Sequence, residues 1–288
     1  MKKTSAKTIA IILPVLIALF SHAPVISPCV EGGEMKGRIV FSSQRGGDWR
    51  IWIVEEDGSN LRRLTDGQPE ERDVDPRFSP VGESILFVST RGGKPGIWRI
   101  TSEGKKLERI ADGDQADWNP DGSKIVFRRE ERIVVRDLKT GEEKTVTPQD
   151  WPHCSGPSWS PDGKAIAFAC RWEAGNGIYL VGIEGGEPVK VYDQKGACEP
   201  CWSPDGKRLV YETETHICVI QPDGKKNRPV TYQGGVQRYG DWSPDGRSIV
   251  YCQGVSESGP WELYIVSAEG GTPIRLTEGG SDMNPCWK

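Results

Sequence analysis

The chain has 288 residues, a formal net charge of −4 at pH 7, and 36% hydrophobic and 27% charged residues. This length is enough to bury a large core, and the 35 Gly and 21 Pro indicate many short strands joined by turns. A nucleic-acid-binding domain usually carries a basic face, so the acidic balance argues against nucleic acid as a partner.

The N-terminus has the pattern of an export signal. Three lysines among the first seven residues precede an uncharged stretch over 9–20, and Ala23 offers a small residue for cleavage. A membrane-spanning helix needs about 20 apolar residues, so this stretch is short for a span. We therefore predict a signal peptide over 1–23, a linker over 24–35 and a periplasmic or extracellular protein. The alternative is an uncleaved signal, which would be the chain's only membrane contact.

Cys29 raises the question of a lipid anchor. Lipidated cysteines usually follow a small Gly or Ala, whereas Pro28 precedes this one. Lipidation at Cys29 is therefore disfavoured.

One segment, an aromatic residue followed in its fullest form by Ser-Pro-Asp-Gly, recurs along the chain. Its aromatic residues, at intervals of 40 to 45, are Phe78, Trp118, Trp159, Trp202, Trp242 and Trp287. Each interval holds four short runs of strand-forming residues separated by turn residues, which predicts a four-stranded antiparallel unit. Such small sheets bury both faces when they stack radially around an axis. The predicted fold is all-β, a six-bladed β-propeller over residues 36–288.

The repeated Pro-Asp-Gly residues have the pattern of a tight turn. Pro fixes φ, Asp tolerates the bridge region and Gly takes the left-handed position, so in the fourth repeat Ser160 is expected to pair with Lys164. We assign the aspartates of these turns to turn formation rather than to a catalytic ring. They are Asp121, Asp162, Asp205 and Asp245.

The two ends of the repeat array predict how the ring closes. The chain stops at Lys288, where the next turn would begin, and the segment from Lys36 matches the strand that follows such a turn. The C-terminal strand should therefore be the inner strand of blade 1, and residues 36–66 should supply its other three strands.

The combination of Trp-Ser-Pro-Asp-Gly with the later runs Ile-Ala-Phe, Ile-Tyr-Leu-Val and Leu-Thr resembles the TolB-type propeller repeat over nearly all of residues 36–288. Full-length TolB proteins also carry an N-terminal α/β domain ahead of the propeller, and only about a dozen residues separate the predicted signal from the first strand here. The resemblance implies a binding or scaffolding propeller of the cell envelope without the N-terminal domain of TolB itself.

Motifs for catalysis are missing from the sequence. It holds no Gly-x-Ser-x-Gly nucleophile elbow, no P-loop and no Gly-x-Gly-x-x-Gly fingerprint, and it has three histidines. We expect no enzyme activity and no cofactor. A cation in the central channel is conceivable, but no specific motif supports one.

Seven of the eight cysteines lie between Cys154 and Cys286. The pair Cys198 and Cys201 should lie on one extended strand, where three residues span about 10 Å, too far for a disulfide. In the predicted turn register Cys154 lies opposite Cys170, and we expect a disulfide between them in an oxidising compartment. The other cysteines are expected to be buried as small hydrophobic residues. A metal cluster of Cys154, Cys198, Cys201 and Cys286 near the channel is the alternative.

Strand direction predicts where a binding site would lie. Each inner strand starts at the end of the ring that also bears the loops between the second and third strands of the blades; we call this end the loop face and the Pro-Asp-Gly end the turn face. The residues three before each aromatic should surround the channel mouth at the loop face. They are Asp75, Gln115, Gly156, Glu199, Tyr239 and Asn284.

The loops of this face should expose residues typical of binding surfaces. These are Arg45, Trp49, Arg91, Arg171 and Trp172. The leading prediction is therefore a module that binds a protein, or a small or polymeric ligand, at the envelope. Alternatively, the polar ring only solvates a water-filled channel.

Two further functions remain open. One is a lyase or hydrolase with a cation held by Asp75 and Glu199 at the channel mouth, since propellers host such chemistry. The other is a structural protein of the cell surface.

Overall fold

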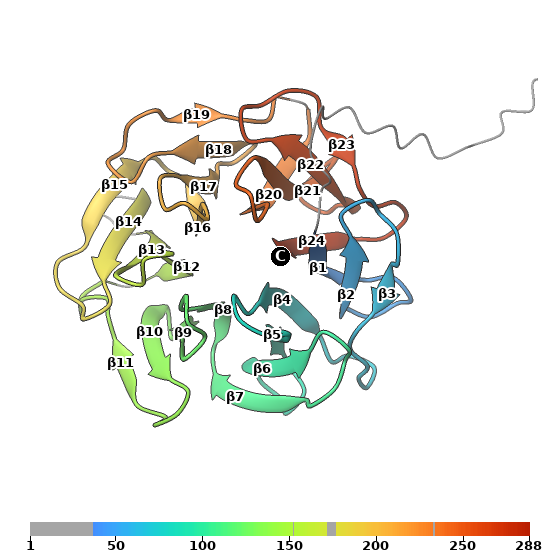
Figure 1. Cartoon of the computed structure of the whole chain (residues 1–288), viewed down its shortest axis with the longest axis horizontal. Coiled ribbons are helices and arrows are strands. Elements are labelled where there is room, and N and C mark those ends of the chain that lie inside the picture. Colours follow the sequence, from blue (N-terminus) through green and yellow to red (C-terminus); the bar gives the residue numbers. More distant parts are fainter. Residues whose placement is uncertain (1–36, 152, 172–176, 233) are drawn as a thin grey trace, which may run out of the picture. The chain divides into compact units, whose positions relative to one another are not determined.

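The computed structural model describes residues 37–151, 153–171, 177–232 and 234–288. These form six sheets, each of four antiparallel strands, arranged around a central axis as blades of a propeller (Figure 1). The predicted all-β, six-bladed fold is confirmed. No helix long and apolar enough to cross a membrane occurs in these ranges, and the predicted signal peptide, linker and Cys29 lie outside them.

The strands of each blade follow here from the axis outward. Blade 1 contains β24 (Asp282–Trp287), β1 (Arg38–Ser43), β2 (Arg50–Glu55) and β3 (Arg62–Arg63). Blade 2 contains β4 (Asp73–Phe78), β5 (Ser84–Ser89), β6 (Gly96–Thr101) and β7 (Glu108–Asp112). Blade 3 contains β8 (Asp114–Trp118), β9 (Lys124–Arg129), β10 (Arg132–Asp137) and β11 (Glu143–Thr145). Blade 4 contains β12 (Cys154–Trp159), β13 (Ala165–Cys170), β14 (Gly177–Gly182) and β15 (Val189–Asp193). Blade 5 contains β16 (Cys198–Trp202), β17 (Leu209–Glu212), β18 (Ile217–Ile220) and β19 (Arg228–Pro229). Blade 6 contains β20 (Val236–Trp242), β21 (Ser248–Gly254), β22 (Trp261–Ser267) and β23 (Ile274–Arg275).

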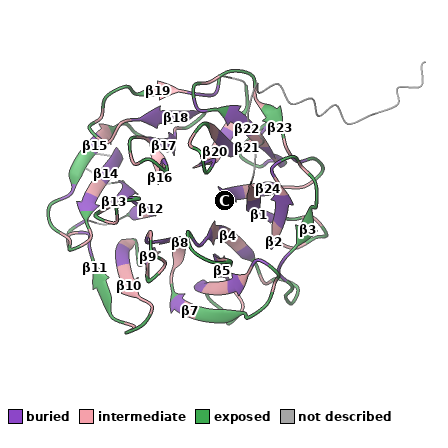
Figure 2. Cartoon of the chain, viewed as in Figure 1, coloured by how far each residue is buried: buried purple, intermediate pink, exposed green. Residues whose placement is uncertain are grey.

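The hydrophobic core lies between the blades. Each buried cluster joins side chains of two neighbouring sheets: Ile133 of blade 3, for example, packs with Ile166 and Phe168 of blade 4. The second strand is almost wholly buried in every blade except blade 3, where β9 is half-buried, whereas the outermost strands β3, β11 and β23 are exposed (Figure 2). Because both faces of these second strands are covered by neighbouring blades, they can be continuous apolar runs, as in Ile166 to Cys170 of β13.

The ring closes as predicted, by a strand from the C-terminus. β24 pairs antiparallel with β1, with Trp287 opposite Ile39. Trp287 is buried with Phe41 of its own blade and with Val250 and Leu263 of blade 6. One short strand therefore joins the first and last blades.

Every inner strand contains a β-bulge near its middle. In blade 4, Trp159 lies opposite Ile166 and Ser160 donates its N–H to Ala165, while Cys154 lies opposite Cys170. The predicted turn pair Ser160–Lys164 is thus wrong by one residue. The bulge between Ser155 and Ser158 inserts one extra residue, which restores the predicted partner of Cys154.

Ring closure predicts a large loss of stability when β24 is damaged. Trp287→Ala should lower the free energy of unfolding by about 3–5 kcal/mol, the usual cost of truncating a large buried aromatic side chain, and deletion of 282–288 should cost more. Thermal melts should show a drop of several degrees, since about 1 kcal/mol moves a chain of this size by roughly 2–4 °C. Ile274→Ala on the exposed strand β23 is the control and should change little. Shifts below about two degrees in both β24 variants would contradict the closure.

Candidate functional site

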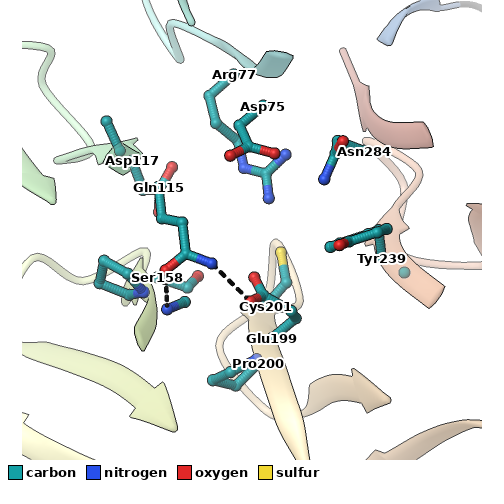
Figure 3. A pocket seen from close by; sticks show the side chains of 14 residues that line it. Asp75, Arg77, Gln115, Asp117, Ser158, Glu199, Pro200, Cys201, Tyr239 and Asn284 are labelled. Carbon is teal, nitrogen blue, oxygen red and sulfur yellow. Dashed lines mark hydrogen bonds between the residues drawn. The ribbon is translucent and has the colours of Figure 1, made fainter. Parts of the chain in front are cut away.

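The bulges aim one residue of every blade at the propeller axis. The six residues predicted to surround the channel mouth all have left-handed φ angles, between +49° and +56°. They line a single cavity, together with residues one to two positions further along the inner strands (Figure 3). The volume that the centres of water molecules can occupy in this cavity is about 30 Å³, which is enough for about two waters. These six residues form a ring around the axis, which we call the mouth ring.

The left-handed backbone of this ring has a cost. Five of its six residues are not glycine, and each such residue stores on the order of 1–3 kcal/mol of strain. Strain of this kind persists where surrounding structure over-determines it, and it concentrates at functional sites. The repetition around the ring makes the mouth ring the leading candidate for a site.

Gln115 and Glu199 close part of the ring across blade 4. The Gln115 Nε2 donates to Glu199 Oε1 at 2.9 Å, and the Gly156 N–H donates to Gln115 Oε1 at 3.1 Å. A Cβ atom at Gly156 would lie 2.9 Å from Glu199 Oε2. The missing side chain in blade 4 is what allows residues from blades 3 and 5 to meet.

Two carboxyl groups of the ring have perturbed acidity. Burial, with the nearby Glu212 and Asp75 carboxylates, raises the pKa of Glu199 to about 8. Burial also raises the pKa of Asp75 to about 6, against the attraction of Arg77. At neutral pH Glu199 is therefore mostly protonated and Asp75 mostly ionised. Such perturbed groups in a cavity are characteristic of functional sites.

Arg77 is a channel residue that the sequence analysis overlooked. It precedes the aromatic residue of its blade, at a position where the other blades carry Asp117, Ser158, Cys201, Asp241 and Cys286. Although burial lowers it, the surrounding Cys286, Asp241, Cys201 and Asp117 raise the pKa of Arg77. The guanidinium is the one cationic group at this position, and a comparison of the six repeats would have revealed it.

Arg77 lines two cavities. Besides the mouth ring it contributes to a wider funnel of about 470 Å³ at the turn face, which is bordered by the repeated aromatic residues and by five prolines. The floor of the funnel and the floor of the mouth-ring cavity share Arg77, Asp117, Ser158 and Cys201. A layer of charged and polar side chains thus separates the loop-face cavity from the turn-face funnel.

Two arginines predicted on exposed loops are instead structural. The side chains of Arg45 and Arg91 are 15% and 13% exposed, and they pair at 2.5 Å with Asp282 and Asp73, which are fully buried. Removing either arginine would leave a buried carboxylate unpaired. The prediction that Arg45 and Arg91 are exposed binding residues is therefore wrong.

The remaining loop-face residues divide differently. Arg171 is exposed, as predicted. Trp49 is half-buried, with the guanidinium of Arg72 5.7 Å from its ring centroid. Trp172 lies outside the described residues.

The turn aspartates have the predicted role. Asp162 Oδ1 accepts hydrogen bonds from Ser160 Oγ at 2.7 Å and from the Lys164 N–H at 3.1 Å. These bonds lower the pKa of Asp162, and Asp121, Asp205 and Asp245 are held in the same way. Their carboxylates are therefore occupied by the turns.

The cysteines divide as the strand geometry requires. Cys198 Sγ contacts Glu212 at 3.2 Å, whereas Cys201 Sγ contacts Asp241 at 3.0 Å, so these two thiols face different partners. Among the described residues, no three of His, Cys, Asp and Glu are grouped in a way that would hold a metal ion. Neither a cysteine cluster nor a carboxylate site for a cation finds support there.

The raised pKa of Glu199 predicts an unusual pH dependence for Glu199→Gln. Between pH 4.5 and 8 the unfolded chain ionises Glu199 while the native cavity resists it, so wild-type stability falls across this window, by on the order of 1.4 kcal/mol per pH unit at most. Gln cannot ionise and can still accept the bond from Gln115. The melting temperature of the variant, relative to wild type, should rise from pH 5 to pH 8 and then level off.

Asp121→Asn is the control for this measurement. The turn bonds lower the pKa of Asp121, so its ionised form is the favoured one in the fold and the variant should gain nothing as pH rises. Parallel stability curves for Glu199→Gln and wild type would show that the carboxyl is not desolvated.

The Cys154–Cys170 pair remains a predicted disulfide. The Arg171 N–H donates to His153 O, so residues 153 and 171 form a hydrogen-bonded pair across the strands. The next pair, Cys154 and Cys170, is therefore a non-hydrogen-bonded pair, in which the two Cα atoms lie closer together. Both residues are thiols in the structure, with Sγ atoms 3.2 Å apart. Peptide mapping of oxidised, non-reduced protein should find them linked, and Cys154→Ser should abolish a reductant-dependent drop in melting temperature. Two free thiols after oxidation would contradict this prediction.

Comparisons with known proteins agree with this geometry. The family model of the TolB beta propeller domain matches residues 18–132 and 117–288. TolB from Acinetobacter baumannii superposes with a TM-score of 0.73 at 21% identity, covering 88% of this chain and 67% of that one. A chain of the nidogen/laminin complex gives 0.69 at 9%, covering 87% and 98%, and an oligogalacturonate lyase in complex with manganese gives 0.54 at 18%, covering 86% and 74%. The chain therefore belongs to the TolB beta propeller domain family.

Proposed function

We propose that this chain is an exported, non-enzymatic binding propeller that takes a protein or ligand partner over the mouth ring on its loop face. The observation that carries the proposal is the mouth ring itself, in which one residue from each of the six blades, five of them strained, borders one small polar cavity. A cavity with room for about two waters suits the tip of a partner's side chain better than a whole small molecule.

The surroundings of the cavity support a macromolecular partner. Val255, in the loop between β21 and β22, is 83% exposed, and Arg171 is exposed in the corresponding loop of blade 4. Exposed apolar and arginine side chains on loops of a rigid scaffold are typical of protein interfaces. Family membership and the presence of a similar propeller in the nidogen/laminin complex are consistent with this use of the fold.

Export is part of the proposal and rests on the lysine-rich start and uncharged stretch of residues 1–23. Fusion of residues 1–30 to a reporter tests it. A reporter that stays in the cytoplasm would refute export and also remove the oxidising environment that the Cys154–Cys170 disulfide requires.

Variants of the two faces test the location of binding. Arg171→Glu and Val255→Asp should weaken capture of a partner from an envelope extract about tenfold or more, because each places a charge into the interface, and should leave the melting temperature nearly unchanged. Asp205→Asn on the turn face is the matched control and should retain capture. If the turn-face variant loses more binding than the two loop-face variants, the site lies on the opposite face.

One observation favours the enzymatic alternative. Asp75 and Glu199 share a cavity and have raised pKa values of about 6 and about 8, as in a general acid and base pair. The relative in complex with manganese is a lyase of similar fold. Incubation with oligogalacturonates and other oligosaccharides, with and without Mn²⁺, discriminates the two functions. Turnover that Asp75→Asn abolishes would replace the binding proposal by a catalytic one.

A further inference from the structure

A third cavity lies on the turn-face side of blade 5, and it shares no lining residue with the mouth ring. It is a groove of about 350 Å³ between the β16–β17 turn, the β18–β19 hairpin and the β22–β23 turn of blade 6. Its volume is within the range of ligand sites. Four cationic and two acidic side chains line it: Lys207, Arg208, Lys226, Arg228, Asp205 and Glu269.

The two guanidiniums of this groove are fixed in place. Arg208 stacks over the ring of Trp242, with 4.6 Å from its Cζ to the ring centroid, and donates to Gly246 O at 2.9 Å. Arg228 donates to Ala268 O at 2.9 Å. Since both side chains are held by other groups, little rotational entropy remains to be lost on binding an anion.

A carboxylate of the protein itself already occupies the two guanidiniums. Glu269 accepts from Arg208 at 3.0 Å through one oxygen and from Arg228 at 2.6 Å through the other. The Glu269 side chain is 74% exposed, and its ion pairs are with the two arginines of the groove. The arrangement demonstrates that two oxygens of one anion fit between these two arginines.

The groove keeps a surplus of positive charge beside Glu269. Lys226 has no ion pair in the described part of the chain and is exposed, and Lys207 is 78% exposed with only a long contact of 3.7 Å to Asp205. Asp205 is engaged by the Ser203 hydroxyl and the Lys207 N–H within its turn. The surplus contrasts with the acidic balance of the whole chain.

We infer that this groove is a binding site for a phosphate group, which displaces the Glu269 carboxylate from Arg208 and Arg228 and is flanked by Lys207 and Lys226. Two fixed guanidiniums offer bidentate hydrogen bonds to oxyanions, and the lysines add charge without fixed geometry. The phosphate is that of a lipid headgroup or of a soluble phosphate compound. This inference is independent of the function proposed for the mouth ring.

Binding to the full chain tests the site in two arms. Titration with inorganic phosphate and tripolyphosphate measures the soluble source, and cosedimentation with phosphatidylglycerol vesicles, compared with phosphatidylcholine vesicles, measures the lipid source. Saturable binding in either arm is expected, and the arm that binds more tightly identifies the source. Absence of saturable binding in both arms would overturn the inference.

Three variants separate a built site from general attraction to positive charge. Lys226→Glu and Arg228→Gln should weaken binding about tenfold or more, since charge-assisted bonds to phosphate are lost. Glu269→Gln should instead tighten binding several-fold, because the competing carboxylate is removed. Weaker or unchanged binding in Glu269→Gln would contradict the displacement of Glu269.

Blade 3 provides a matched control. There Glu143 joins Arg129 and Arg136 in a similar triad, but the neighbouring Lys144 is paired with Glu184 at 2.8 Å. Arg129→Gln should leave phosphate binding within about twofold of wild type. An equal loss there would show that the blade 5 groove has no special affinity and would overturn the inference. Melting curves of each variant confirm that it is folded.

Discussion

The propeller depends on a belt of hydrogen bonds around the axis, one at each junction between blades. At four junctions the backbone N–H of the repeated aromatic residue in one blade donates to the side chain that precedes the aromatic residue of the previous blade. The Trp159 N–H donates to Asp117 and the Trp287 N–H donates to Asp241, both at 2.8 Å. Arg77 cannot accept a hydrogen bond, and at that junction the indole of Trp118 donates to the Arg77 carbonyl instead, as Trp242 does to Cys201. At these two junctions the indole replaces the backbone N–H as the donor of the belt.

The belt also accounts for the mouth ring. On one side of its bulge, each inner strand is held by the belt. On the other side it pairs with the second strand of its blade, so the backbone at the bulge has little conformational freedom. The left-handed residue in between is therefore over-determined by bonds on both sides, which is the condition under which strain of about 1–3 kcal/mol per residue persists. Asp75 and Glu199 are desolvated for the same reason, since the scaffold fixes them at the axis whether or not a partner neutralises them.

Sequence periodicity predicted the blades, the closure by β24 and the positions of all six mouth ring residues, because a repeat of about 42 residues leaves few alternative arrangements. It did not predict the bulges, which shift pairing by one residue without changing the alternation of apolar side chains on either side. The loop arginines were misjudged for a different reason. Arg45 and Arg91 are separated by 237 and 18 residues from their partners Asp282 and Asp73, and no local pattern shows that a charged loop residue will meet a buried carboxylate.

The misjudged arginines illustrate a general contrast between apolar burial and polar pairing. Apolar burial follows strand period and can be read along the chain, whereas polar pairing depends on which blades become neighbours. Gln115 and Glu199 are a clear example: they meet only because blade 4 carries Gly156 between them. The groove at Arg208 and Arg228 is another, because its carboxylate comes from the next blade. In this propeller the repeated geometry lies within each blade, whereas the polar contacts that set one blade apart from another lie where different blades meet.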